Sequence, residues 1–275
     1  DSVENFGPIE LKRGWNLIGN PYLQDIDWVN MQISYQGMKV DIITAADSAH
    51  KWVLDYGFIW EKPESESEYR YCIVTNRSEE DMADGSLYRS IPSWHGYWVK
   101  ALVDCQLYIK APAGANGASA VAKITPAAQK PMSASAALPA TRWTVRIGAT
   151  NGDQKDDKNY FGVNTKKEES IECPAYPSGY VDLYLTNPRG TARYMYDIKS
   201  GEKAGQTWRF KVIAVTPGDV ILTWDGLESV TPGTRLILFD ETAGVSQEMV
   251  AGGSYSYSWH AGDAERVFKI VIADK

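Results

Sequence analysis

Hydrophobic and polar residues alternate along most of the chain in short runs, which is typical of β-strands with one buried face. Residues 142–149 place Trp143, Val145 and Ile147 on one face and arginine and threonine on the other. Turn residues separate such runs at intervals of about 8–12 residues, so we predict an all-β protein of β-sandwich (jelly-roll or Ig-like) type. The other predicted strands lie at 15–18, 39–43, 58–61, 69–75, 96–102, 106–110, 208–212, 220–225, 235–239, 254–259 and 267–272.

Helix is expected in two short places only. Residues 25–31 follow the Asn20-Pro21 break and are expected to form about one helical turn. Residues 78–84 begin with Ser78 and carry Asp81 three positions later, which is a weak capping signal.

A stretch of low complexity divides the two halves of the chain. Residues 113–137 are dominated by Ala, Ser, Pro and Gly and contain no aromatic residue. Such a segment buries too little apolar surface to offset its ordering entropy, so it is expected to be an extended linker. The sequence therefore predicts two β-sandwich domains, 1–112 and 138–275, joined by this linker.

Length and charge limit the classes of partner. A chain of 275 residues exceeds the usual size of one core. Its net charge of −7 disfavours nucleic acid and anionic membranes, and no apolar run is long enough for membrane insertion. The three cysteines show no metal-ligand spacing and are interpreted as buried thiols, while pairing of Cys72 with Cys105 stays open.

No motif for nucleophilic, nucleotide-dependent or metal-dependent catalysis occurs in the sequence. His50, His95 and His260 lie in unrelated contexts. The acidic runs at 61–68 and 79–81 have the composition of solvated loops. We therefore expect a protein that is not an enzyme, and keep a glycoside-active enzyme as an alternative because two carboxylates suffice for that chemistry.

One cluster of oxygen-bearing side chains is a candidate for calcium. Asp153, Asp156, Asp157 and Asn159 fall within seven residues, and hard oxygen ligands at that density suit Ca²⁺. The spacing is not that of an EF-hand, and neighbouring lysines offset the charge. A solvated turn is therefore favoured over a structural Ca²⁺ site, and no other cofactor is expected.

Aromatic residues are biased toward rings with a polar group: ten Trp and sixteen Tyr stand against six Phe. An exposed Trp or Tyr ring can stack on the apolar face of a sugar. Trp94, Tyr97, Trp52 and Tyr56 have polar neighbours in the sequence, so they are the candidate carbohydrate-binding residues. The aromatics that stand among aliphatic residues are expected in the core instead: Trp15, Trp98, Trp143, Trp208 and Trp224.

Two phrases in the first half carry a family resemblance. Residues 14–22 read GWNLIGNPY and residues 90–101 read SIPSWHGYWVKA. Together they resemble the "GWNLIGNP … GFWVKA" β-sandwich modules found near the C-termini of large secreted or surface-attached bacterial proteins. The second half, with NYFGV at 159–163 and LTWDGL at 222–227, resembles the Ig-like C-terminal segment that accompanies those modules.

The resemblance and the aromatic residues together predict a non-catalytic carbohydrate-binding or surface-adhesion module of a larger secreted bacterial protein. Its expected partners are a neutral polysaccharide and neighbouring domains of a longer chain, and its expected location is extracellular or at the cell surface. A structural spacer, anchor or fibre subunit is the main alternative. Glycan binding requires exposed rings, a structural role predicts buried rings, and an enzyme requires a pocket with two facing carboxylates.

Overall fold

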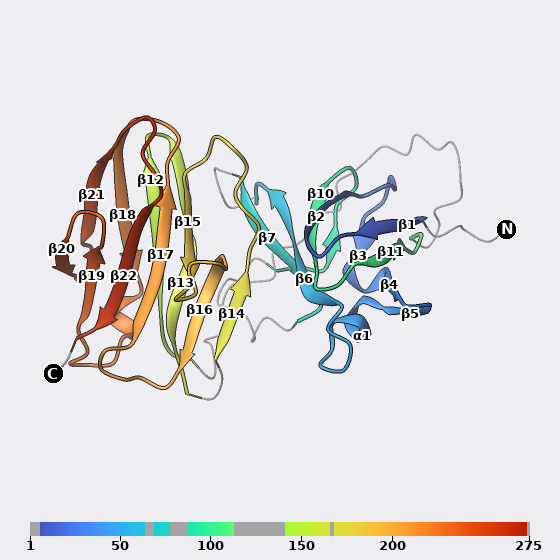
Figure 1. Cartoon of the computed structure of the whole chain (residues 1–275), viewed down its shortest axis with the longest axis horizontal. Coiled ribbons are helices and arrows are strands. Elements are labelled where there is room, and N and C mark those ends of the chain that lie inside the picture. The colour runs from blue at the N-terminus through green and yellow to red at the C-terminus, as the bar shows by residue number, and fades with distance from the viewer. Residues whose placement is uncertain (1–5, 64–68, 78–86, 113–140, 166–167, 274–275) are drawn as a thin grey trace. The chain divides into compact units, whose positions relative to one another are not determined.

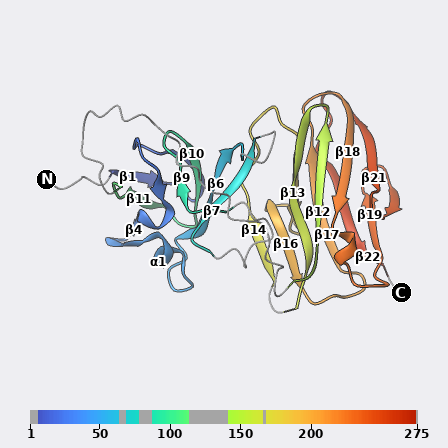
Figure 2. The same cartoon turned by 180° about the vertical axis from the view of Figure 1, so that it is seen from behind.

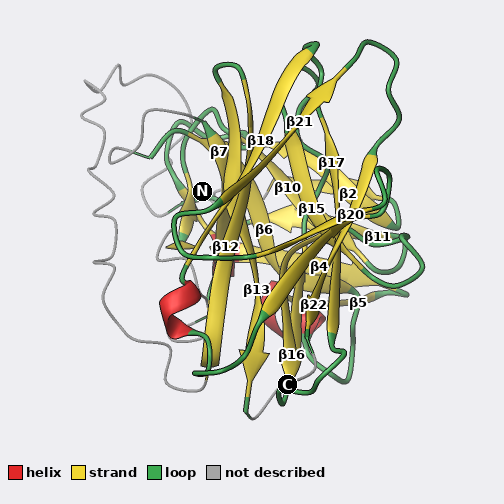
Figure 3. Cartoon of the chain, turned by 90° about the vertical axis from the view of Figure 1, so that its left-hand side faces the viewer, coloured by secondary structure: helices red, strands yellow, loops and turns green. Residues whose placement is uncertain are grey.

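The computed structural model describes residues 6–63, 69–77, 87–112, 141–165 and 168–273. It divides into two compact units, Asp1–Ala137 and Leu138–Lys275, called unit 1 and unit 2 below. The regular structure of the described residues is curled β-sheet with a few short helical turns (Figures 1, 2 and 3). The predicted all-β class is therefore confirmed. The predicted linker 113–137 and the predicted helical segment 78–84 lie outside the described residues.

Unit 1 contains two main sheets and one short strand pair. The four-stranded sheet has the order β1-β11-β4-β5, and the five-stranded sheet the order β2-β10-β6-β7-β8. All neighbours in these sheets are antiparallel except β7 and β8. The strands of the first sheet are β1 (Phe6–Leu11), β11 (Cys105–Ile109), β4 (Met31–Tyr35) and β5 (Met38–Asp41). Those of the second are β2 (Gly14–Gly19), β10 (Gly96–Ala101), β6 (Val53–Glu61), β7 (Arg70–Thr75) and β8 (Leu87–Tyr88), while β3 (Ile26–Asp27) pairs with β9 (Ser90–Ile91).

The inward faces of both main sheets contribute to one apolar core. Strand β10 shows the reason: Tyr97, Val99 and Ala101 are buried, while the residues between them are more exposed. Because side chains alternate across a strand, every second residue of β10 reaches this core. Leu107 and Ile109 of β11 belong to the same cluster from the other sheet.

A short helix interrupts the first half where a strand was predicted. The predicted strand 39–43 ends early, at Asp41, and α1 (Ile42–Ala46) begins directly after it. The Asp41 carboxylate accepts the Thr44 amide at 2.9 Å and so caps the helix. Hydrogen bonds from Thr44 hold the pKa of Asp41 below its usual value. The predicted helical segment 25–31 forms only the 3₁₀ turn η1 (Trp28–Asn30).

Gly57 of β6 permits a close approach in the core of unit 1. A Cβ atom at this position would lie 2.4 Å from the backbone oxygen of Trp98 and 2.9 Å from the ring of Trp28. The Trp28 ring is fully buried. The glycine is therefore required by packing between β6, β10 and η1, and not by a turn.

Unit 2 is built from one curled sheet with the order β20-β19-β22-β17-β15-β16-β13-β12-β18-β21, and β14 pairs with β16 off this path. All its strand pairs are antiparallel except β13 with β16. A 3₁₀ turn, η3 (Leu227–Ser229), follows β18. The strands are β12 (Thr141–Asn151), β13 (Gln154–Asn164), β14 (Glu169–Glu172), β15 (Asp182–Thr186), β16 (Tyr194–Ser200), β17 (Thr207–Ile213), β18 (Gly218–Asp225), β19 (Leu236–Asp240), β20 (Val245–Glu248), β21 (Ser254–Trp259) and β22 (Arg266–Ile272).

The concave face of this sheet encloses the core of unit 2. In β18, Val220, Leu222 and Trp224 are buried and alternate with exposed residues, as the sequence pattern predicts. Trp143 and Trp208 are buried in the same cluster, with ring centroids 5.5 Å apart. The prediction that Trp143, Trp208 and Trp224 are core residues is confirmed.

All three cysteines are buried free thiols, so Cys72 and Cys105 are not paired. Burial and the nearby carboxylates of Asp104 and Glu10 raise the pKa of Cys105 to about 11. This thiol is therefore protonated at neutral pH and behaves as a small apolar side chain.

Candidate functional site

The two phrases that carry the family resemblance are neighbours in unit 1. Most of the first lies in β2 and the second half of the second in β10, and these strands pair antiparallel with Gly19 opposite Gly96. The segment that follows β2 and the segment that precedes β10 therefore meet at one end of the sheet. Residues 20–25 and 92–95 are called the loop pair below.

Asn20 joins the two segments of the loop pair. Its side-chain nitrogen donates to the carbonyl oxygens of Gln24, Ile91 and Pro92, at 3.0, 3.2 and 3.1 Å. Its backbone amide donates to the carbonyl oxygen of His95 at 2.9 Å. An aspartate has nearly the same size as this asparagine, but its carboxylate has no hydrogen atom to donate to these carbonyl oxygens. Asn20 therefore ties the segment after β2 to the segment before β10.

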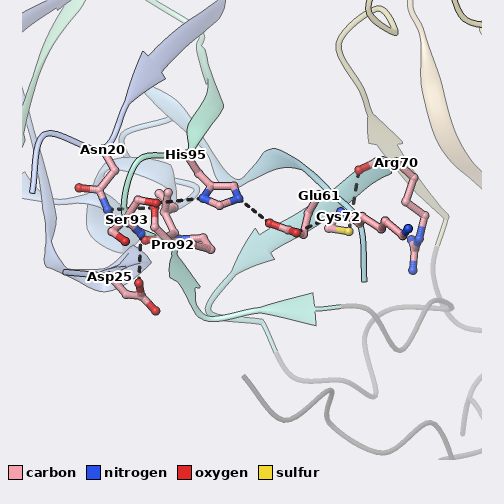
Figure 4. A network of polar contacts seen from close by, with 10 residues as sticks. Asn20, Asp25, Glu61, Arg70, Cys72, Pro92, Ser93 and His95 are labelled. Carbon is pink, nitrogen blue, oxygen red and sulfur yellow. Dashed lines mark hydrogen bonds and ion pairs between the residues drawn. The ribbon is translucent and has the colours of Figure 1, made fainter. Parts of the chain in front are cut away.

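Two further contacts hold the segment before β10 (Figure 4). The Ser93 amide donates to the Asp25 carboxylate at 3.1 Å. His95 lies with Nδ1 3.0 Å from the Ser93 carbonyl oxygen and Nε2 2.6 Å from Glu61 of β6. The backbone on both sides of Trp94 is thus fixed by hydrogen bonds.

Trp94 is presented to solvent from this fixed backbone. Its exposed fraction is 75%, the largest among the described large hydrophobic residues. Its φ of 64° is in the left-handed region, which costs a non-glycine residue on the order of 1–2 kcal/mol. Such strain persists only where the surroundings impose it, and it is common at functional sites. The predicted exposure of Trp94 is confirmed.

Replacing Trp94 by glycine and by alanine separates the backbone strain from the ring. Both variants delete the indole, but only glycine adopts φ of 64° without a steric penalty. We expect Trp94→Gly to be more stable than Trp94→Ala by about 0.5–1 kcal/mol, measured as the free energy of unfolding in denaturant. Equal stability of the two variants would show that the Trp94 backbone is not strained.

The other three predicted carbohydrate-binding rings are buried, so the prediction that they are exposed is wrong. Tyr97 has no exposed surface because the alternation of β10 directs it into the core. Trp52 packs against His50 at 4.8 Å between ring centroids. Tyr56 packs edge to face on Phe58 at 5.9 Å. Polar neighbours in the sequence were a poor guide because adjacent residues of a strand point to opposite faces.

Two tryptophans that were expected in the core lie instead on the face of the five-stranded sheet opposite to Tyr97 and Val99, a face that also carries the buried ring of Phe58. Trp15 of β2 and Trp98 of β10 are half-buried there, and Leu17, the register partner of Trp98, is 63% exposed. A Cβ on Gly96 would lie 3.4 Å from the Leu17 side chain, so Leu17 covers that glycine.

The three histidines pair with different carboxylates. His50 lies 2.9 Å from Asp47, and His260 lies 3.4 Å from Asp263, both as local pairs three residues apart. Hydrogen bonds from His50 hold the pKa of Asp47 below its usual value. Among the described histidines, His95 is the one whose carboxylate partner is distant in the sequence: it lies before β10 and contacts Glu61 of β6. None of these pairs contains a serine, threonine or cysteine side chain.

The four predicted calcium ligands are not brought together. Asp153 is exposed, while Asp157 forms an ion pair with Lys155 at 2.8 Å. Asp156 and Asn159 are buried in unit 2 and bond to each other at 2.9 Å. Within the described ranges, no group of three His, Cys, Asp or Glu side chains is placed to hold a metal ion.

Asp156 is the centre of a buried polar network instead. Besides Asn159, it accepts the Tyr176 hydroxyl at 3.0 Å and the Leu183 amide at 2.7 Å. Burial and the charge of Asp182 raise the pKa of Asp156 to about 8, against the effect of the three donors. Asp182 in turn bonds to Arg193. Because β13 and β15 both supply residues, the network ties neighbouring parts of the sheet together.

Comparison with known proteins finds no match: no family model, no curated protein and no solved structure is similar to this chain. Among the helices that the structure describes, none has the length and apolar character needed to cross a membrane.

Proposed function

We propose that this protein is a non-catalytic module that binds a neutral glycan or a glycan-coated surface. The observation that supports the proposal most strongly is Trp94, an exposed indole on a strained backbone that Asn20, Asp25 and His95 hold in place. A flat, exposed ring on a backbone that is already fixed suits stacking on a pyranose, because the segment that carries it loses little backbone freedom on binding.

Charge around the loop pair favours a neutral glycan over an anionic one. The Asp25 and Glu61 carboxylates lie at the loop pair, and the whole chain carries a net charge of −7. These charges repel uronate and sulfate groups. The same carboxylates can accept hydrogen bonds from sugar hydroxyls. The partly exposed ring of His95 lies beside them.

A single exposed ring implies weak binding. One stacked aromatic contact contributes about 0.5–1.5 kcal/mol beyond its buried area. A dissociation constant of about 1 mM corresponds to about 4.1 kcal/mol in total. We therefore expect affinities near the millimolar range for one site, and tighter attachment only where several modules act together.

Trp94→Ala is expected to weaken glycan binding by about tenfold or more, the factor that corresponds to 1.4 kcal/mol. The substitution removes the exposed ring and leaves the core untouched, so the melting temperature should change little. Titration of a panel of neutral oligosaccharides, including cello- and xylo-oligosaccharides, followed by tryptophan fluorescence and calorimetry, measures the effect.

Met38→Ala is the matched control for this measurement. Met38 is also exposed, at 54%, but lies on β5 of the other sheet, so its loss should leave the affinity unchanged. Binding that survives Trp94→Ala would place the site elsewhere and contradict the proposal. No binding by the parent protein to any glycan of the panel would contradict it as well.

A structural role is the second candidate, and the burial of Tyr97, Trp52 and Tyr56 favours it. Three of four candidate rings serve the core, as expected for a spacer, anchor or fibre subunit. The two proposals differ in one measurable way: a structural module shows no glycan binding, with or without Trp94.

The setting that we propose follows from the family resemblance. The two units are taken as β-sandwich modules of a larger secreted bacterial protein, located outside the cell or at its surface and flanked by other domains. The shared core between the two main sheets of unit 1 is consistent with such a sandwich.

A further inference from the structure

Strand β21 is the last strand at one end of the curled sheet of unit 2 (Figure 1). It pairs antiparallel with β18, and among the described residues no backbone group bonds to its other side. Its sequence, SYSYSW, contains neither a charged residue nor a proline. An unpaired strand edge of this kind is a template on which another chain can form a strand.

The backbone groups that face outward from β21 follow from contacts of β18. The carbonyl oxygen of Asp219 on β18 accepts the side chain of Asn151 on β12 at 3.2 Å, so it faces β12. Opposite residues of an antiparallel pair either bond to each other or both face away. Ser258, the register partner of Asp219, therefore directs its N–H and C=O groups outward, and alternation places those of Ser256 on the same side. We call Ser256 and Ser258 the serine window.

The chain itself closes the edge at both ends of the serine window. The Ser254 carbonyl oxygen accepts the side chain of Gln247 on β20 at 2.9 Å. Directly after β21, the His260 amide donates to the Asp263 carboxylate at 2.7 Å, and the His260 carbonyl oxygen accepts the Asp263 amide at 3.1 Å. Within the part of the chain that the structure describes, the outward N–H and C=O groups of the serine window have no partner.

The other strand edges that the structure describes carry features that hinder pairing with a further strand. Proline, charge and short length are such features. Strand β1 contains Pro8 and pairs irregularly with β11. Strands β5, β14 and β20 have four residues each, with charged residues among them, and β3, β8 and β9 have two each. Strand β2 is uncharged, but the Asn16 side chain bonds to the carbonyl oxygens of Lys12 and Gly14 and so covers its start.

We infer that β21 pairs with β21 of a second copy of this chain, so that two copies of unit 2 form one continuous sheet. A two-fold axis at Tyr257 sets Ser256 of one copy opposite Ser258 of the other. Each of these two pairs exchanges two hydrogen bonds, so the dimer gains four. The bonds that already occupy Ser254 and His260 stay unchanged in this register.

The side chains of β21 are complementary to a second β21 strand. Opposite residues of a sheet share a face, so this register sets serine against serine on the exposed face. On the other face it sets aromatic against aromatic, Tyr255 against Trp259 and Tyr257 against Tyr257. Such pairs stabilise neighbouring strands. Because β21 carries no charge, no like charges meet within the pair, and nothing favours an oppositely charged partner over a second copy.

The charge of the whole chain determines how the dimer responds to salt. Each copy carries a net charge of −7, and the Asp219 carboxylate accepts the Ser258 hydroxyl at 3.1 Å, close to the proposed contact. Two copies therefore repel each other, and salt screens this repulsion. The dimer should be weak, since it gains only four hydrogen bonds, and it should become tighter as the salt concentration rises.

Dimer formation would also change attachment to a glycan. If Trp94 binds a glycan as proposed above, a dimer presents two such rings and attaches to a polysaccharide more tightly than one copy. This consequence rests on the proposed function, whereas the pairing of β21 does not.

The test is sedimentation velocity of the full chain over several decades of protein concentration, at low and at high salt. Ser256→Pro should weaken the dimer by about tenfold or more, because both copies lose a donor and two of the four bonds disappear. The substitution spares the pairing with β18, since the Ser256 N–H faces outward.

Ser254→Pro is the matched control. It also removes an outward N–H of β21, but outside the serine window and at the first residue of the strand, where proline is tolerated. It should leave the dimer unchanged. Denaturant titration of both variants checks that they are folded.

Amide hydrogen exchange of the parent protein tests the same contact without any substitution. The amides of Ser256 and Ser258 should exchange more slowly as the protein concentration rises. The Tyr257 amide faces β18 and should be protected at every concentration, so it is the internal reference.

Three results would overturn the inference. One is a parent protein that stays monomeric at every concentration and salt, which would leave the edge to a different chain or to solvent. The second is a dimer of equal affinity in Ser256→Pro, which would place the contact elsewhere. The third is exchange of the Ser256 and Ser258 amides that does not depend on concentration. A protein that dimerises as expected but binds no glycan refutes the proposed function alone, and a monomer that binds glycan through Trp94 refutes this inference alone.

Discussion

Gly57→Ala is expected to destabilise unit 1 by about 3 kcal/mol or more, which is at the upper end of the cost of overpacking. The added methyl group would meet the Trp98 backbone oxygen at 2.4 Å and the Trp28 ring at 2.9 Å. The first of these is a backbone atom, so relief requires β6 and β10 to separate. Since whole domains are stable by about 5–15 kcal/mol, this is a large fraction of the total.

Gly19→Ala provides the matched comparison. Gly19 lies in β2, also next to β10, but a Cβ there meets no atom within 4 Å. Its replacement should change the free energy of unfolding by about 0.5 kcal/mol or less, as for other surface positions. Denaturant titration of both variants, with hydrogen exchange read out on the strands of unit 1, distinguishes the two. Similar stabilities would show that the close approach at Gly57 is relaxed without cost.

The free energy of unfolding of unit 2 is expected to fall as the pH rises toward about 8, the raised pKa of Asp156. Burial and the Asp182 charge favour the protonated carboxyl in the folded protein, whereas the unfolded chain titrates near the ordinary value of 3.8. Between these two values the folded state binds the extra proton. Stability therefore declines with pH, by up to about 1.4 kcal/mol per pH unit for one group.

Asp156→Asn should flatten this decline. The variant removes the titrating group. Its side chain has only one accepting oxygen, however, so its NH2 group must face at least one of the three donors Asn159, Tyr176 and Leu183. We therefore expect a loss of about 1–3 kcal/mol at acidic pH, the cost of a mismatched buried polar group, and a smaller loss above pH 8. Carboxyl carbon NMR of Asp156 and denaturation at several pH values measure the midpoint and the slope.

Asp240 is the control of opposite sign. Burial alone would raise its pKa, but hydrogen bonds from Arg266, the Ala243 amide and Tyr255 hold it below the usual value. Its contribution to stability is therefore lost as the pH falls, not as it rises. A stability of unit 2 that increases from pH 5 to pH 8, in the parent and in Asp240→Asn alike, would contradict the role given to Asp156.

The aromatic residues show where inference from the sequence stops. Alternation within a strand places Trp143 and Trp224 inward, because their aliphatic neighbours at positions i±2 share that face. Tyr56 also has apolar neighbours at i±2, Leu54 and Phe58, and the prediction that it is exposed rested on Asp55, which is adjacent to it. Trp52 lies just before β6 and packs against His50, a contact that alternation does not indicate. Flanking polarity says nothing about those contacts.

Residues 153–159, which were interpreted as a solvated turn with a Ca²⁺ site as the alternative, also show that local composition does not report tertiary contacts. Residues 153–159 include the start of β13, although their charged composition disfavours a strand. Strand pairing with β12 and the three donors around Asp156 outweigh that local preference. These donors come from residues up to 27 positions away, so no local pattern could indicate them.

By itself the sequence determined the all-β class and most strand positions, because the hydrophobic effect acts on a period of two that is visible in the chain. It also offered four candidate exposed rings, of which Trp94 alone is exposed. Only the tertiary structure decided that the other three are buried, that Asn20 ties the two phrases together, and that His95 reaches Glu61. These features depend on which strands become neighbours and in which register, and that choice is made by the packing of the whole unit rather than by local preference.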